Sequence, residues 1–158
     1  MVPMPMSTPP KPYFAGNFRH SLDEKNHLTI PSSWRGLFAK GTTFLAIPNP
    51  GGYVTVLPPA EAEKLYEKFA AVPLSDTEAQ NDISVFTAST QTLSFDSQGR
   101  IALNESLSSH AGITSSKSEV VLVGGLNKFN LYNTAKWTEV ESASTSASQR
   151  SVMQRFGI

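Results

Sequence analysis

The sequence predicts a mainly β fold with flanking helices (α+β), built from two copies of one strand-turn-strand unit. Short alternating strands lie between turn residues along the chain. The chain also matches itself in order, which is the mark of an internal repeat. The matching segments are 18–30 with 90–103, and 51–65 with 126–140. Because four short strands and one helix bury too little apolar surface to fold alone, the two copies are expected to share a core.

Proline residues divide the first copy into its expected elements. Pro31 ends a strand, Pro59 opens a helix at a position where a missing amide hydrogen is harmless, and Pro73 ends that helix. The elements expected are a strand at 27–30, a short helix at 32–38, a hairpin with strands at 44–47 and 53–56, and a helix at 60–71.

The second copy repeats this order after a linking helix. Ser75 with Glu78 three residues later predicts a capping box that opens a helix over 76–89. The elements expected beyond it are a strand at 100–103, a helix at 105–112 that ends at Gly112, a hairpin with strands at 120–123 and 129–132, and a helix at 134–143.

These elements predict a division of the chain into five parts. They are a disordered arm at 1–12, a first unit at 13–72, a linking helix at 73–89, a second unit at 90–142 and a mobile C-terminal tail at 143–158. The aromatic side chains lie on the apolar phase of their elements, so we expect them in the core and not as platforms for bases. They are Phe14, Phe18, Trp34, Phe44, Phe129, Tyr132 and Trp137.

Charge is distributed unevenly although the net charge is zero. Residues 1–58 hold three more Lys and Arg than Asp and Glu, residues 59–78 hold three fewer, and the remainder balances. A basic face is compatible with this pattern, and so is ordinary scattered surface charge. The absence of cysteine excludes a disulfide framework and thiolate metal sites. No apolar run is long enough to span a membrane, so we expect a cytoplasmic protein.

Several motifs together resemble one family. Residues 14–25 read F-x-G-x-F-x-H-S-L-D-x-K, and L-T-I-P and W-R follow within 28–35. The second half contains F-D-S-Q-G-R-I at 95–101, H-A-G-I at 110–113, E-V-V-L-V-G at 119–124, N-K-F at 127–129, and Trp137. In these motifs the chain resembles the MraZ family over residues 13 to about 140.

The resemblance implies both a fold and a function. The fold is two AbrB-like swapped-hairpin units that form one pseudo-dimeric barrel. The function is sequence-specific regulation of transcription: a ring homo-oligomer, associated with the nucleoid, binds short direct repeats in double-stranded DNA upstream of the division and cell-wall genes. The family's Asp-x-x-x-Arg signature, once per half, is associated with that DNA contact.

The first half departs from this signature. The second half has Asp96, Gly99 and Arg100, whereas the first has Asp23 followed by Asn26 and His27. Asparagine tolerates the left-handed backbone of such a turn. Histidine lacks the permanent charge and fixed fork of arginine, so full-strength DNA binding is not expected of the first turn.

Five residues are candidates for DNA contact and four for the turns. The DNA candidates are Arg19, Lys25, His27, Arg35 and Arg100, and the turn residues are Asp23, Asn26, Asp96 and Gly99. Each cation has the alternative role of a solvated surface charge. For Arg100 two interpretations stay open, pairing back onto Asp96 in an Asx turn or contacting a phosphate.

The sequence does not favour an enzyme. His20, Asp23 and His27 could offer ligands to zinc, but the turn between them scatters the side chains. His110 has no partner in the sequence and fits a core or helix-end histidine. We therefore expect no catalytic residue, metal, cofactor or small-molecule substrate. The alternative to a regulator is an oligomeric scaffold that has lost or weakened operator binding.

Overall fold

The computed structural model describes residues 13–114, 116–143 and 146–158, so the arm predicted at 1–12 lies outside the described residues. The protein is a mainly antiparallel sheet with several helices, which confirms the α+β class. The first copy contains strands β1 (Asn17–Ser21), β2 (His27–Thr29), β3 (Phe44–Asn49) and β4 (Tyr53–Leu57), and helices α1 (Ser32–Arg35) and α2 (Pro59–Ala70). The link is α3 (Thr77–Ala88). The second copy contains β5 (Gln91–Leu93), β6 (Arg100–Ala102), β7 (Glu119–Gly124) and β8 (Phe129–Asn133), and helices α4 (Glu105–Ala111), α5 (Thr134–Ser142) and α6 (Ser146–Phe156).

The two copies exchange strands. The larger sheet has the order β1-β7-β8-β4-β3-β5, and β2 pairs with β6 in a second, two-stranded sheet. The first strand of each copy therefore pairs with the hairpin of the other: β1 with β7, and β5 with β3. Neither half could keep its sheet without the other, because each would lose one edge strand and the β4–β8 pairing at the centre.

An approximate twofold axis relates the copies. Equivalent residues face each other in an antiparallel pair only where such an axis crosses it. Thr55 pairs with its equivalent Asn130, and the Thr55 hydroxyl donates a 2.8 Å hydrogen bond to the Asn130 side-chain oxygen. Leu28 pairs in the same way with its equivalent Ile101 in the small sheet. The axis therefore passes through both sheets.

One core serves both halves. Phe14 and Trp34 of the first copy surround Phe129 of the second, with ring centroids 5.1 to 5.6 Å apart. All three rings are 0–1% exposed. Phe44 and Tyr132 are buried as well, and Phe18 packs against the core, while Trp137 is half-buried. The predicted placement of the aromatic residues in the core is thus confirmed for Phe18 and for the five buried rings.

The helices follow the sequence with two corrections. The predicted capping box at Ser75 is wrong, because Asp76 caps α3 instead: its carboxylate accepts a 3.1 Å hydrogen bond from the Ala79 amide. The first helix is shorter than expected and ends at Gly36. Gly112 ends α4 in the left-handed conformation, with φ +69°, as predicted.

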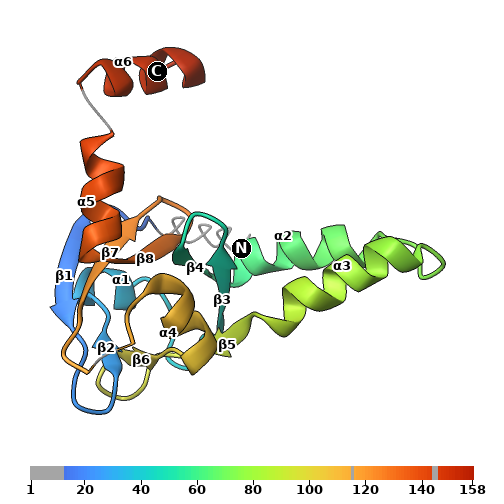
Figure 1. Ribbon diagram of the computed structural model, residues 1–158, viewed down its shortest axis with the longest axis horizontal. Coiled ribbons are helices and arrows are strands. Elements are labelled where there is room, and N and C mark those ends of the chain that lie inside the picture. The colour runs from blue at the N-terminus through green and yellow to red at the C-terminus, as the bar shows by residue number, and fades with distance from the viewer. Residues whose placement is uncertain (1–12, 115, 144–145) are drawn as a thin grey trace, which may run out of the picture.

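Helices α2 and α3 form a pair of helices, called the arm from here on (residues 59–88), which is distinct from the N-terminal segment 1–12. The arm extends away from the sheets to the right in Figure 1. Phe69 and Phe86 hold its two helices together through an edge-to-face ring contact of 5.5 Å, and neither helix contains a fully buried residue. Within the described residues, no helix has both the length and the apolar character needed to cross a bilayer.

Candidate nucleic-acid interface

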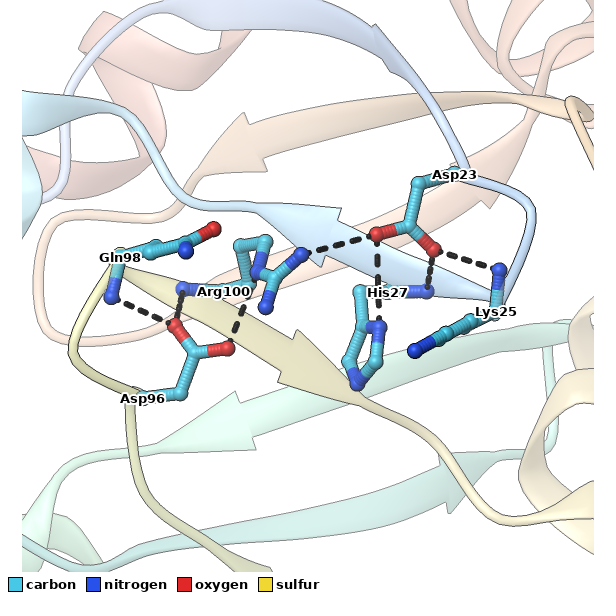
Figure 2. Close-up of polar contacts among 6 residues, drawn as sticks. All are labelled: Asp23, Lys25, His27, Asp96, Gln98 and Arg100. Carbon is cyan, nitrogen blue, oxygen red and sulfur yellow. Dashed lines mark hydrogen bonds and ion pairs between the residues drawn. The ribbon is translucent and has the colours of Figure 1, made fainter.

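Two equivalent turns lie side by side at one edge of the molecule. We call them the paired turns: residues 23–27 of the first copy and 96–100 of the second. Strands β2 and β6 follow the turns directly, and their antiparallel pairing places the two turns on either side of the twofold axis (Figure 2). The sequence predicted the turns, and the pairing brings them together.

An aspartate closes each turn in the same way. Asp23 Oδ1 accepts 2.8 Å hydrogen bonds from the amides of Lys25 and His27. Asp96 Oδ1 accepts equivalent bonds from the amides of Gln98 and Arg100, at 2.9 and 2.8 Å. The penultimate residue of each turn has a positive φ, +61° at Asn26 and +74° at Gly99. Asparagine thus supports the same turn as glycine here.

Arg100 joins the two turns. Its Nε donates to Asp96 Oδ2 at 2.9 Å, and its Nη1 donates to Asp23 Oδ2 across the axis at 3.1 Å. Figure 2 shows the guanidinium between the two carboxylates. The side chain retains 29% exposure. Arg100 therefore holds the two turns together, and its side chain stays partly exposed.

His27 occupies the position equivalent to Arg100 but makes only part of its contacts. Its Nδ1 lies 3.3 Å from Asp23 Oδ2, an ion-pair distance if the ring is protonated. The geometry is not that of a hydrogen bond, so the buried Nδ1 has no hydrogen-bond partner among the described residues. Among the described residues, no hydrogen bond or ion pair is found between the His27 and Asp96 side chains. Consequently, only Arg100 of the second turn forms a hydrogen bond to the opposite turn.

The hydrogen bonds of the turns hold both carboxyl groups in the charged form. The His27 backbone amide, aided by the Lys25 amide and by the charges of His27 and Arg100, lowers the pKa of Asp23 below 3.8 against an opposing effect of burial. The Arg100 amide, aided by the Gln98 amide and the Arg100 side chain, lowers the pKa of Asp96 in the same way. Both carboxylates are thus part of the folded turns at neutral pH.

Acid is therefore expected to loosen the paired turns. A carboxyl whose pKa is lowered on folding contributes stability above its unfolded value of 3.8, and that contribution disappears as the pH falls through the lower folded value. Unfolding free energy measured in urea should fall between about pH 5 and pH 2. The double variant Asp23→Asn, Asp96→Asn keeps acceptors for the turn amides but does not titrate, so its decline should be shallower. An equal decline in both proteins would contradict this account.

The other candidate cations lie around the turns in different states. Lys25 is exposed on the first turn, and its ammonium forms no ion pair within the part of the chain that the structure describes. Arg35 lies across Gly99, where any Cβ would overlap its side chain, and its Nε donates to the Ile30 carbonyl at 2.8 Å. Arg19 lies on β1 and forms a 3.1 Å ion pair with Glu119. Of these cations, Lys25 is the least engaged.

Two further lysines approach the turns that sequence reasoning did not identify. Lys40 lines a cavity of about 290 Å³ together with Arg35, Asp96 and Gly99. Lys117 is exposed in the loop before β7. This loop lies against the start of the first turn, because the Ser118 carbonyl accepts a 2.8 Å hydrogen bond from the Leu22 amide. The loop with Lys40 belongs to the first copy and flanks the second turn, whereas the loop with Lys117 belongs to the second copy and flanks the first turn. Because these neighbours result from strand exchange, the sequence alone does not reveal them.

Among the residues that the structure describes, no three His, Asp or Glu side chains are grouped so that they could hold a metal ion. His110 lies elsewhere, on α4, with its Nε2 against the backbone carbonyl of Asn49 at the end of β3.

The comparisons with known proteins point to one family. Residues 86–156 match the family model described as "MraZ protein, putative antitoxin-like". Among curated proteins, the chain is 33% identical to the Transcriptional regulator MraZ of Syntrophobacter fumaroxidans, over 80% of this chain and 83% of that protein. It is 30% identical to that of Natranaerobius thermophilus, over 85% and 90%, and 29% identical to that of Clostridium acetobutylicum, over 83% and 89%.

Proposed function

This chain belongs to the MraZ family, and on that premise we propose that it is a sequence-specific DNA-binding regulator of transcription that contacts DNA through the paired turns. The relatives are named as transcriptional regulators and not as enzymes. The observation that carries the proposal is the placement of Lys25, Arg100 and Lys117, from both copies, around one edge of the molecule.

The finer features of the fold belong to the same proposal. The strand exchange and the twofold axis support two AbrB-like swapped-hairpin units, with bounds near 13–72 and 90–142, that enclose a pseudo-dimeric barrel. In this arrangement residues 73–89 link the units. Of the tail predicted at 143–158, residues 144–145 lie outside the described residues and α6 occupies Ser146–Phe156. The twofold axis would let the paired turns meet DNA as one symmetric surface.

In the proposed mechanism, cationic side chains bind DNA phosphates, and assembly of several subunits raises the overall affinity. Lysine and arginine side chains neutralise phosphates and release counterions, which supplies affinity without reading sequence. The proposed contacts are Arg19, Lys25, His27, Arg35 and Arg100, with Lys40 and Lys117 beside them. A ring of subunits would present these contacts repeatedly to short direct repeats upstream of division and cell-wall genes, and linked sites raise avidity by about 10² to 10⁴. Such a protein would be cytoplasmic and associated with the nucleoid.

A gel-shift titration tests the proposal. The purified chain is titrated against DNA from upstream of its own gene, at 50 and 200 mM salt, with a scrambled duplex as control. We expect tighter retardation of the upstream DNA, and an affinity that falls steeply with salt because each phosphate contact contributes about 0.9 to the slope of log affinity against log salt. Absence of retardation at the lower salt would overturn the proposal.

Replacing His27 with arginine should strengthen DNA binding. Arginine at this position can reach across the axis to Asp96, as Arg100 reaches Asp23, and it adds a permanent charge. We expect tighter binding at pH 8, with a salt slope steeper by about 0.9.

The control for that experiment is His110→Arg, which adds the same charge beside the far end of β3. It should leave the affinity nearly unchanged. If both substitutions tightened binding equally, the effect would come from net charge and not from the paired turns.

One observation favours the alternative of an oligomeric scaffold with weakened operator binding. The arginine of the second turn is engaged by two carboxylates, and the first turn has no arginine. A scaffold would assemble normally yet show no difference between the upstream and scrambled DNA. The gel-shift titration and a mass measurement on the same sample therefore separate the two functions.

A further inference from the structure

An apolar groove lies where the arm meets the edge of the larger sheet. Its volume is about 460 Å³, between helices α2 and α3 and strands β3 and β5. The apolar side chains that line it include Leu45, Ala62, Leu65, Tyr66, Phe69 and Phe86. Tyr66 is 72% exposed, and β5 is the last strand of the sheet. The groove is therefore open to a partner.

Helix α6 has an exposed apolar face of matching character. Val152, Met153 and Phe156 are 49, 51 and 70% exposed, and their spacing of three and four residues places them on one face. At 3.6 residues per turn, Arg150 and Arg155 fall on the two flanks of this face. An amphipathic helix of this kind is suited to binding with its apolar face in a groove.

The charges of helix and groove are complementary. Within the arm, Asp and Glu outnumber Lys by six to two, and Glu63 lines the groove itself. Helix α6 contains two arginines and no acidic residue. Opposite charges around an apolar contact steer the two surfaces together and fix their register.

Helix α6 lies away from the groove of its own chain, so the helix that fills the groove is expected to come from a second copy. Helix α5, which leads to α6, packs on β7 and β8, whereas the groove lies at the β3 and β5 end of the same sheet. Figure 1 shows α6 beyond α5, apart from the arm. We propose that α6 of one copy docks in the arm groove of the next copy. This inference rests on the self-assembly within the proposed function and names the surfaces that would perform it.

Such a contact is head-to-tail, since the two surfaces that meet lie at different places on the chain. Head-to-tail contacts repeat from copy to copy and close into a ring when the rotation allows it. Each copy then uses one helix and one groove, and the paired turns take no part in the contact.

Two variants that each remove one surface provide the test. Phe156→Glu places a charge in the apolar face of α6, and Tyr66→Glu places one in the groove. Both side chains are at least 70% exposed, so the fold should be retained, which circular dichroism checks. Glu63→Arg is a second groove variant that leaves every apolar side chain intact. Leu74→Glu, at an 88% exposed position on the tip of the arm outside the groove, is the matched control.

Sedimentation velocity and light scattering at micromolar concentration then measure the mass of each full-length protein. We expect an oligomer for the unchanged chain and the control, and monomers for Phe156→Glu and for Tyr66→Glu. An equimolar mixture of those two should give a heterodimer and nothing larger, because one intact helix meets one intact groove and both outer surfaces are blocked.

The outcomes separate the inference from the function. Variants that keep the mass of the unchanged chain, or a mixture that stays monomeric, would overturn the docking of α6 while leaving self-assembly and DNA binding in place. An unchanged chain that is itself monomeric would overturn both this inference and the proposed ring. Gel shifts with short DNA that contains a single repeat measure DNA binding independently of self-assembly.

Discussion

Replacing Phe129 with alanine is expected to cost about 3 to 5 kcal/mol of unfolding free energy. The ring is fully buried and belongs to the second copy, but the rings that it contacts at 5.1 and 5.2 Å are Trp34 and Phe14 of the first. The cavity left by alanine would therefore open between the two halves. Since the strand exchange denies either half a sheet of its own, we expect both halves to lose stability together.

Urea unfolding gives the size of this loss, and hydrogen exchange shows where it occurs. Amides of β3 and β7, one from each copy's hairpin, should lose protection to the same extent. Leu126→Ala is the matched control, because this 60% exposed side chain lies in the same hairpin and its loss should change stability by less than about 0.5 kcal/mol. Loss of protection in β7 alone would contradict a shared core.

Charge reversal at Lys25 and Lys117 together should have the largest effect on DNA binding. The two lysines come from different copies. Lys25 lies on the first turn, and Lys117 precedes Ser118, whose carbonyl accepts a hydrogen bond from the Leu22 amide next to that turn. If each contacts a phosphate, the double variant should lower the slope of log affinity against log salt by about 1.8. In a ring the loss recurs in every subunit, so a hundredfold weaker affinity or more is expected at 50 mM salt.

Lys68→Glu with Lys128→Glu makes the same change of charge on the arm and on the β7–β8 turn. We expect this control pair to weaken binding only slightly through net charge. Fluorescence anisotropy with labelled duplex measures both affinities. Equal weakening by the two pairs would mean that the paired turns have no special role.

Local pattern was sufficient to predict much of the fold. The alternating strand at 27–30, both hairpins and the ends of α2 and α4 follow from β-branching, proline and Gly112, which act within a few residues. The capping residue of α3 was wrong by one position, because Ser75 and Asp76 are both good caps and the choice depends on where the chain turns after Pro73.

Contacts between the copies could not be predicted in this way. The bond from Arg100 to Asp23 and the bond from the Leu22 amide to the Ser118 carbonyl join residues far apart in sequence, and both result from strand exchange. Comparing the copies does reveal equivalent residues, and the substitution of His27 for arginine was visible from that comparison. Its consequence, a junction held from one side only, required the geometry of the axis.

The central claim is that the paired turns face DNA, and lysine footprinting tests it most directly. The free and DNA-bound protein are treated with an acetylating reagent, and mass spectrometry measures the modification of each lysine. The account predicts that upstream DNA protects Lys25, Lys40 and Lys117, while Lys64 and Lys68 on the arm react as before. Unchanged reactivity at Lys25 and Lys117, with protection on the arm instead, would contradict it.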